Sequence, residues 1–341
     1  MTSHLTPLVA PLAFVAALVV TPLFRRLAPA LGYLDHPDPR KHHPEPTPLL
    51  GGVAVALAVA LGMVLGNVLL HADIEWPRAG VLFGAALSLA LGLVDDRRPM
   101  RPMGKLAGQI AVAVTLILWG ARGGGFLAQQ PLLAAIALVG VVGLLNAVNF
   151  LDAMDGIVAA IVPISAAGFL ALSLLFGAGM DRALGWALAG ACAGFFVYNA
   201  PPARIFLGDA GSHLLGFVLA TLALQALDDA LTVPHAAGVL CILSYPFFDV
   251  LFVVFDRLVT GRPIAEGSTD HTTHRLGRIC GRWGTVALIS LLVTVTSAVG
   301  IGVWSLKSAP LAVGAVLILA LGYAIFGVSL RRKRPTPRSD T

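Results

Sequence analysis

Long apolar segments alternate with short polar breaks along the whole chain. An α-helix needs about 20 predominantly apolar residues to cross the hydrocarbon core of a bilayer, whereas a barrel strand needs about 10 that alternate with polar ones. The segments follow the first pattern. We therefore predict an all-α, polytopic integral membrane protein with about eleven transmembrane helices, at residues 7–30, 49–70, 80–95, 104–121, 131–148, 156–177, 183–199, 211–227, 235–256, 284–304 and 309–330.

The composition supports this pattern. Hydrophobic residues make up 57% of the 341 residues and charged residues only 12%, whereas soluble proteins carry about 25% charged residues. The composition therefore excludes an ordinary soluble protein. We expect residues 1–330 to form a single transmembrane domain with cytoplasmic active-site loops. The basic tail that follows, 331–341, is more typical of contact with anionic lipid than with nucleic acid.

The lysines and arginines are distributed unequally between the two sets of polar breaks. Nineteen of the 23 lie in the breaks after the first, third, fifth, seventh and ninth spans and in the C-terminal tail, and four lie in the other breaks. Basic residues accumulate on the cytoplasmic side of membrane proteins. We therefore expect the N-terminus outside, the C-terminus in the cytoplasm, and every polar cluster described below on the cytoplasmic face.

Five aspartates lie within apolar segments or directly beside them: Asp95, Asp96, Asp152, Asp155 and Asp209. A carboxylate at the centre of a membrane helix costs about 2.5–3.5 kcal/mol even on a lenient insertion scale, so a chain that keeps several of them is expected to use them. Clustered carboxylates with basic residues alongside suit a divalent cation that holds a phosphorylated substrate.

The segment that ends at Gly156 has a polar residue at every third position: Asn146, Asn149, Asp152 and Asp155. Three residues advance an α-helix by about 300°, so the first and last of the four would face opposite sides of a regular helix. All four can converge only if the helix breaks, for which Gly156 is well placed. Irregular backbone at membrane depth is tolerated where it lines a polar cavity. This polar series therefore predicts a site.

Two further breaks offer contacts to a ligand. The first contains Lys41 in the basic run RKHH among several prolines, which suits phosphate but also fits ordinary cytoplasmic charge. The other contains Asp209 between Gly208 and Gly211, where the backbone can approach a ligand closely. Phe206, three residues earlier, could stack on a base. The segment lacks the GK[ST] of a Walker A loop, so ATP hydrolysis is not supported.

The loop before the span at 284–304 contains His271, His274 and Arg275. Imidazolium and guanidinium groups both donate to oxyanions, so these three residues suit a phosphate clamp. A zinc site that also uses Asp270 is the alternative. Within the preceding apolar span, we interpret Asp249 as a residue that supports a neighbour or a helix kink, and not as a catalyst.

Taken in order, these motifs resemble those of the polyprenyl-phosphate N-acetylhexosamine-1-phosphate transferases of glycosyltransferase family 4. The branch that acts with GlcNAc-1-phosphate on undecaprenyl or decaprenyl phosphate looks closest. The resemblance runs from about Asp35 to Leu276 and rests on RKxH…P…GG, DD…K…Q, NxxNxxDxxDG, FxGDxGS, PxxD and a histidine motif before Arg–Leu. Each motif is weak alone, but the ordered set on one predicted membrane face is specific.

The resemblance implies an enzyme that transfers a sugar 1-phosphate from a UDP-N-acetylhexosamine to polyprenyl phosphate and releases UMP. It implies Mg²⁺ as the cofactor, with Mn²⁺ as an alternative. The metal residues would be Asp209 and Asn149. The residues at the acceptor and the diphosphate would be Asp95, Asp96, Lys105, His271, His274 and Arg275. The other substrate contacts would be Lys41, Asn146, Asp152, Asp155 and Phe206, of which Asp155 and Phe206 would contact the uridine.

The chain departs from the family pattern in its histidine motif and after Asp152. Thr273 replaces the middle histidine of HxHHRL, which weakens the assignment at the diphosphate, and Ala153 replaces a common glycine. The PxxHHH-like motif of the muramoyl-pentapeptide enzymes is missing, so the hexosamine branch looks closer. Direct attack by the acceptor phosphate is the simplest chemistry; a covalent aspartyl-phosphate on Asp96 or Asp209 is the alternative.

Other classes of protein fit the pattern less well. A secondary transporter would place its charged residues near the bilayer midplane, and a structural scaffold would not need the polar series or the GDAGS turn. Phospho-N-acetylmuramoyl-pentapeptide transferase is the alternative enzyme. We expect a multi-pass protein of the bacterial cytoplasmic membrane, with the lipid bilayer but no nucleic acid as a partner. The sequence leaves open whether the protein is a homodimer. It also leaves open which polymer the product would serve: lipopolysaccharide, teichoic acid or arabinogalactan.

Overall fold

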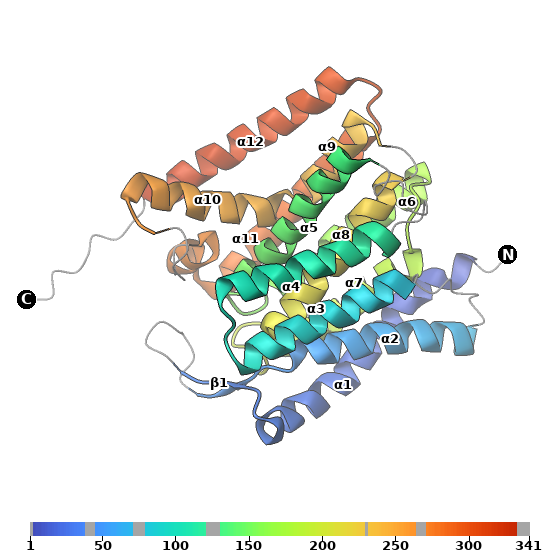
Figure 1. The fold of residues 1–341 in the computed structure, drawn as a ribbon, viewed down its shortest axis with the longest axis vertical. Helices are drawn as coiled ribbons and strands as arrows, with labels where there is room; N and C mark the ends of the chain where they lie inside the picture. Colours follow the sequence, from blue (N-terminus) through green and yellow to red (C-terminus); the bar gives the residue numbers. More distant parts are fainter. Residues whose placement is uncertain are drawn as a thin grey trace, which may run out of the picture.

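The computed structural model describes residues 3–37, 45–70, 79–120, 130–228, 231–263 and 271–332. Within these ranges the chain is almost entirely helical (Figure 1). The helices are η1 (Ser3–Leu8), α1 (Val9–Leu31), α2 (Gly51–Leu70), α3 (Ala79–Arg97), α4 (Pro102–Thr115), η2 (Leu116–Gly120), α5 (Pro131–Leu151), α6 (Ile157–Phe176), α7 (Arg182–Asn199), α8 (Gly208–Asp228), α9 (Val233–Ile242), α10 (Ser244–Thr260), α11 (Thr272–Trp304) and α12 (Ala309–Arg332). Two short strands, β1 (Leu34–Asp35) and β2 (Thr47–Pro48), pair antiparallel.

The prediction of an all-α polytopic membrane protein is confirmed. In the part of the chain that the structure describes, eight helices are long and apolar enough to cross a membrane. A ninth span results if α9 and α10 are counted together. The apolar helix at Pro102–Leu118 is shorter, and α7 does not belong to the eight. The total of eleven spans therefore stays a prediction.

Two of the predicted spans differ from the structure. The span predicted at 235–256 is broken, because α9 and α10 meet at an angle of 73°. Pro246 lies in the first turn of α10 and has no N–H to donate to the carbonyl of Ile242, four residues earlier, so it cannot continue the helical hydrogen bonds of α9 into α10. The span predicted at 284–304 begins earlier, at Thr272, and is interrupted at Gly281, whose φ of 71° and ψ of 172° suit glycine. Residues 272–280 therefore form a separate helical segment before the long span.

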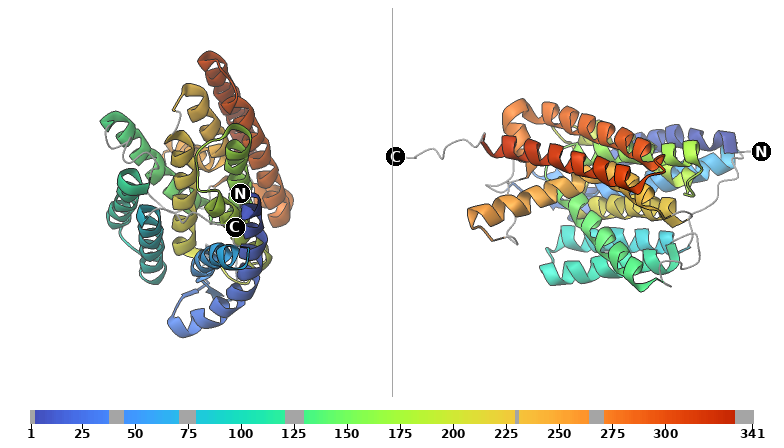
Figure 2. Two further views of the ribbon diagram at one scale, coloured as in Figure 1. Left: turned by 90° about the vertical axis from the view of Figure 1, so that its right-hand side faces the viewer. Right: turned by 90° about the horizontal axis from the view of Figure 1, so that it is seen from above.

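Helix α8 is the central helix of the bundle, as the end-on view in Figure 2 shows. Of its most apolar stretch 89% is buried, against 17% for α12. Glycines let α2 and α3 approach the start of α8 closely. A Cβ atom on Gly52 would lie 2.2 Å from the nitrogen of Gly211, and one on Gly92 would lie 2.3 Å from the Cα of Ala210. Any larger residue at Gly52 or Gly92 would force these helices apart.

Successive helices alternate in direction, so one end of the bundle collects the ends of α1, α3, α5 and α7 and the starts of α2, α4, α6 and α8. Contacts between the helix ends support this grouping: the start of α8 contacts the start of α2 and the end of α3. The start of α1 and the end of α12 lie at opposite ends of the bundle (Figures 1 and 2). This arrangement brings the described residues of the predicted polar clusters to a single end.

The alternation predicts that Cys280, directly before the interruption of α11 at Gly281, and Lys307, three residues after the end of α11, are on opposite sides of the membrane. Cys280 is exposed, whereas Cys192 and Cys241 are buried. A membrane-impermeant thiol reagent should therefore label the native protein only after the inner face is opened, and should label a Lys307→Cys variant in intact cells. Cys280→Ser gives the background. Labelling of Cys280 in intact cells would show that the predicted orientation is wrong.

Candidate active site

The first turn of α8 presents Asp209 at the end of the bundle where the helix ends meet. Gly208 adopts a left-handed conformation, with φ of 74°, immediately before this turn. The two oxygens of Asp96 accept hydrogen bonds from the backbone N–H groups of Asp209 and Ala210, at 2.8 and 3.0 Å. A carboxylate at a helix N-terminus satisfies N–H groups that have no partner in the helix and complements the helix dipole.

Asp96 was predicted to act on the substrate, but both of its oxygens are occupied by the α8 backbone. We therefore assign it a capping role that holds Asp209 in place. The space beside it is tight: a Cβ atom on Gly208 would lie 2.8 Å from one Asp96 oxygen. The neighbouring Asp95 points elsewhere, as expected for adjacent residues on a helix. It accepts from the N–H of Met100 at 2.6 Å and contacts Lys105 at 2.7 Å.

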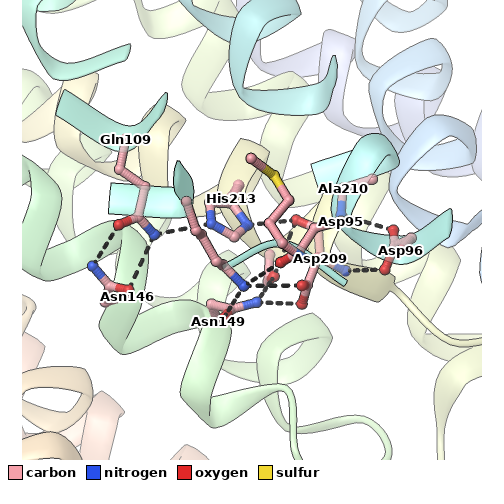
Figure 3. Close-up of polar contacts among 11 residues, drawn as sticks. Asp95, Asp96, Gln109, Asn146, Asn149, Asp209, Ala210 and His213 are labelled. Carbon is pink, nitrogen blue, oxygen red and sulfur yellow. Dashed lines mark hydrogen bonds and ion pairs between the residues drawn. The ribbon is translucent and has the colours of Figure 1, made fainter. Parts of the chain in front are cut away.

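The ammonium group of Lys105 lies among three oxygens that come from three helices. Figure 3 labels the residues that provide these oxygens, Asp95, Asn149 and Asp209. Its Nζ is 2.7 Å from Asp95 Oδ2, 2.9 Å from Asp209 Oδ2 and 3.1 Å from Asn149 Oδ1. Asn149 in turn donates to Asp209 Oδ1 at 2.6 Å and to Ser212 Oγ at 2.9 Å. The structure thus brings together four predicted site residues, since oxygens of Asp95, Asn149 and Asp209 face the ammonium group of Lys105. These four residues are the Lys105 cluster.

A buried polar group lies next to this cluster. Gln109 and Asn146 exchange two amide hydrogen bonds, at 3.0 and 2.8 Å, and Gln109 Nε2 also lies 3.0 Å from His213 Nε2. The opposite ring nitrogen of His213 lies 2.7 Å from the backbone oxygen of Asp209. His213 is not among the site residues that the sequence predicted. The available signal was its position four residues after Asp209, which places both on one face of α8.

The polar series predicted a helix break, and the structure has one. Helix α5 ends at Leu151, and Gly156 adopts φ of 77° before α6. The four polar residues do not all converge, however. Asp155 turns toward the loop after α7, where it accepts from the N–H of Ala203 at 3.1 Å and from Arg282 Nη1 at 3.2 Å. The break therefore divides the series between the Lys105 cluster and a second location beside α11.

Asp152 lies in the turn directly after α5 and is half-buried. Burial raises the pKa of this carboxyl well above its usual value, and the negative charges of Asp209, Asp96 and Asp155 raise it further. A hydrogen bond from the N–H of Gly208 partly offsets this rise. The end of the bundle therefore holds more negative charge than Lys105 alone neutralises, which favours binding of a further cation.

Phe206 extends the short strand pair. Its N–H donates to the carbonyl of Pro48 at 2.8 Å, and its carbonyl accepts from the N–H of Gly51 at 3.0 Å. The ring is half-buried, and its stacking on a base stays a prediction. Lys41 and Asp270 lie outside the described residues. The phosphate contact expected of Lys41 and the zinc alternative that uses Asp270 therefore also stay predictions.

His271 lies at the start of α11 and is held by Asp249 of α10. Its Nδ1 is 2.7 Å from Asp249 Oδ2, and the other oxygen of this buried carboxylate accepts from the N–H of Thr272 at 2.8 Å. The interpretation of Asp249 as a supporting residue is confirmed. The ring of His271 lies 5.9 Å from that of Phe150 and 6.4 Å from that of His274, measured between ring centroids. His271 is therefore placed beside the end of α5.

Arg275 does not join the predicted phosphate clamp. Its Nη2 lies 2.6 Å from Asp256 Oδ2, and both side chains are buried. Its guanidinium also lies over the ring of Phe252, at 4.8 Å. Asp256 bonds to Arg331 at 2.8 Å as well, so it links α10 to both α11 and α12. We correct the role of Arg275 from substrate contact to structural ion pair, because burial directs its charge toward Asp256.

The Lys105 cluster fits the requirements of Mg²⁺. Within the described residues, no group of three or more His, Cys, Asp or Glu side chains is arranged to hold a metal ion. Mg²⁺, however, typically uses one or two carboxylates, with waters and substrate phosphates completing its octahedron. Asp209, Asp95 and the amide oxygen of Asn149 are hard oxygen donors that already face one cationic group. These residues could therefore hold the metal.

Comparison with known proteins agrees with this site. Residues 78–227 match the model of the family described as glycosyl transferase family 4. A phospho-N-acetylmuramoyl-pentapeptide-transferase of Moorella thermoacetica is 32% identical over 304 residues, which cover 81% of this chain and 91% of the relative. The chain belongs to glycosyl transferase family 4. The matched residues include every member of the Lys105 cluster, whereas His271 lies beyond them.

Two other relatives of the family carry names for a different sugar. A decaprenyl-phosphate N-acetylglucosaminephosphotransferase of Mycolicibacterium smegmatis is 30% identical over 288 residues, which cover 75% of this chain and 71% of the relative. A protein of Bacillus subtilis named "Probable undecaprenyl-phosphate N-acetylglucosaminyl 1-phosphate transferase" is 28% identical over 272 residues, covering 77% and 75%. The motif resemblance to this family is thereby confirmed.

The structural role of Arg275 can be tested with Arg275→Met, which keeps an apolar stem on Phe252. Removing one partner of a buried ion pair lowers the free energy of unfolding by about 3–5 kcal/mol. We expect a loss near the lower end of this range, because Asp256 keeps its contact with Arg331. We therefore expect a lower melting temperature with the KM of both substrates within twofold of the wild type. Arg278→Met, an exposed change on the same helix, is the control. A raised KM at unchanged stability would restore the phosphate clamp.

The charge of Asp152 should appear in the pH dependence of stability. Its pKa is higher in the folded than in the unfolded chain, so its ionisation destabilises the fold increasingly as the pH rises above about 4. Asp152→Asn removes this cost. With EDTA present, the variant's melting temperature should exceed that of the wild type by more at pH 8 than at pH 4.5. An advantage that is equal at both pH values would contradict the assignment.

Proposed function

We propose that this protein transfers N-acetylglucosamine 1-phosphate from a UDP-sugar to polyprenyl phosphate, which gives a polyprenyl-diphospho-sugar and UMP. This would be the first membrane step of a cell-envelope polysaccharide. The observation that carries the proposal is the convergence of Lys105, Asp95, Asn149 and Asp209 at one end of a bundle of membrane-length helices. Family membership and the names of two relatives point to the same reaction.

We place the active site on the cytoplasmic face of the bacterial inner membrane. The reasons are the nineteen basic residues on one set of breaks and the meeting of the helix ends at that side. A site at a membrane surface suits this reaction, because the donor is water-soluble and the acceptor is held in lipid by its prenyl chain. The site must therefore be reachable from both phases.

The reaction brings two anions together. An oxygen of the acceptor phosphate attacks the β-phosphorus of the UDP-sugar; a new P–O bond forms as the bond to UMP breaks, and UMP leaves with the bonding electrons. A phosphate monoester has a second pKa near 6, so the acceptor is mostly dianionic at pH 7 and needs no general base. The protein's contribution is positioning and neutralisation of charge, and the covalent aspartyl-phosphate route stays an alternative.

The described side chains divide this work. Asp209 and Asn149, with Asp95 beside them, would hold Mg²⁺, which when bound supplies a Lewis acid to phosphate oxygens. Lys105 at present contacts the same three oxygens. Once another cation neutralises the oxygens of Asp95, Asn149 and Asp209, the N–H groups of Lys105 become available to donate to phosphate oxygens. His271 uses Nδ1 toward Asp249, so its Nε2 is the ring nitrogen that can reach a phosphate oxygen.

A second candidate function is supported by one observation. The Moorella relative named phospho-N-acetylmuramoyl-pentapeptide-transferase is 32% identical and is covered over 91% of its length. The two reactions share donor chemistry and acceptor and differ in the sugar. The missing PxxHHH-like motif favours N-acetylglucosamine. The donor itself decides between the two.

The proposal is tested with purified protein, polyprenyl phosphate, MgCl₂ and a panel of UDP-sugars, with UMP release as the measurement. UDP-N-acetylglucosamine should give the highest kcat/KM. If UDP-N-acetylmuramoyl-pentapeptide is used best instead, the second candidate function is correct. If no UDP-sugar yields UMP while the protein is folded, the proposal fails.

Asp209→Asn should abolish turnover in folded protein, because it removes one charge and one ligand position together. Residual activity above about a tenth corresponds to a loss below about 1.4 kcal/mol of barrier, which is too small for a metal ligand. Asp181→Asn is the matched control. Asp181 is buried and accepts a hydrogen bond from Gln225 at the far end of the bundle, so this variant should keep its activity.

Phe206→Ala tests the uracil contact. Stacking on a base is worth about 1–3 kcal/mol, so the variant should raise the KM for the UDP-sugar about tenfold and leave the KM for polyprenyl phosphate nearly unchanged. The alternative is a membrane-interface aromatic, whose loss would lower stability alone. Trp283→Ala, at an exposed aromatic residue on α11, is the control for that case. An unchanged KM for the UDP-sugar would exclude the stacking role.

A further inference from the structure

Beneath the Lys105 cluster, α4, α5 and α8 each contribute a second polar side chain one helical turn deeper in the bundle (Figure 3). The upper layer consists of Lys105, Asn149 and Asp209, and the lower layer consists of Gln109, Asn146 and His213. The spacings of four, three and four residues place each pair on one face of its helix. Gln109 is 1% exposed and His213 is 0% exposed, so these two residues are inside the protein, and Asn146 is half-buried.

The hydrogen bonds of the lower layer have one consistent direction. Asn146 Nδ2 donates to the carbonyl of Val142 at 2.9 Å and to Gln109 Oε1 at 2.8 Å, which leaves Asn146 Oδ1 to accept from Gln109 Nε2 at 3.0 Å. The second N–H of Gln109 then donates to His213 Nε2 at 3.0 Å.

The imidazole proton must therefore lie on Nδ1 of His213. That nitrogen is 2.7 Å from the carbonyl oxygen of Asp209, and a carbonyl can only accept. The chain of bonds thus runs from Val142 in α5 through Gln109 in α4 to Asp209 in α8. Each side chain in it uses its donors fully. Such a network holds only one arrangement of its members.

We propose that the lower layer is a positioning device for the upper one, and that His213 is a positioning residue that acts through Asp209. Gln109 ties α4 to both α5 and α8, and Lys105 stands one turn above it on α4. The layer therefore sets where the ammonium group and the metal-binding oxygens meet. The inference rests on the proposed function, since it assigns the layer to that reaction.

The expected effect of disturbing the lower layer follows from the precise geometry that metal and phosphate sites require. Metal and phosphate ligands work only when they are held within about 0.5 Å of the productive geometry. Mutation of a residue that hydrogen-bonds to a metal ligand typically lowers metal affinity or activity by about 10- to 100-fold. A polar layer that merely joined helices would contribute to stability and would leave the metal requirement unchanged. The two roles therefore differ in a measurable quantity.

The experiment compares His213→Leu with Thr221→Val in the full-length protein. Thr221 is also buried in α8 and also bonds to the carbonyl four residues earlier, that of Phe217, at 2.9 Å, but it lies two turns beyond the lower layer. For His213→Leu we expect the Mg²⁺ concentration for half-maximal UMP release to rise about tenfold or more. The stabilisation of the melting temperature by Mg²⁺ alone should shrink as well. Thr221→Val should lower stability without either effect.

His213→Asn provides a second variant in case leucine prevents folding. Its amide N–H can replace Nδ1 as the donor to Asp209, so the Mg²⁺ requirement should return to within about threefold of the wild type. If His213→Leu and Thr221→Val lose stability alike and keep the wild-type Mg²⁺ requirement, the layer is only structural and the inference is wrong. A wild type that neither releases UMP nor gains stability from Mg²⁺ would refute the proposed function itself, and the inference with it.

Discussion

The structure depends on the neutralisation of negative charge at the start of α8, where Asp95 is buried and Asp209 is half-buried. Asp95 and Asp209 lie where apolar helices meet, and isolated carboxylates there would be costly. Lys105 contacts both carboxylates and the amide oxygen of Asn149, so one cationic group connects α3, α4, α5 and α8. The same arrangement that makes the fold tolerable also concentrates cation-binding oxygens at one end of the bundle.

Close helix packing makes this arrangement possible. Gly52 and Gly92 let the backbones of α2 and α3 touch the first turn of α8, and Asp96 caps that turn from α3. Small residues serve the same purpose at other helix contacts in membranes, where the hydrophobic effect does not drive helices together. Three residues on two neighbouring helices, Gly52, Gly92 and Asp96, therefore fix the first turn of α8 without a bound substrate.

Residues of the family motifs serve two purposes in this protein. Lys105, Asn149 and Asp209 face a common point and are suited to contact substrate or metal. Asp96 and Asp249 instead hold backbone or a histidine in position. A motif records which residues occur together, and both kinds of residue occur in it. Only the contacts separate them.

The sequence by itself determined the all-α membrane class, the helix break at Gly156 and the grouping of polar breaks at one end. These follow from local properties: the length of apolar runs, the conformational freedom of glycine and the alternation of successive spans. The limits of local information appear at α9 and α10. Their combined apolar length predicted one span with a possible kink, and the 73° bend that divides it into two helices became visible only in three dimensions.

The tertiary structure alone decided what each charged residue contacts. Arg275 follows the predicted clamp histidines in sequence, yet it pairs with Asp256 from another helix. His213 carried no motif signal of its own, and its importance follows from Gln109 on α4 and Asn146 on α5. Hydrogen bonds and ion pairs act over about 3 Å. The partners named here lie between 19 and 104 residues apart along the chain, so only the packing of the helices could select them.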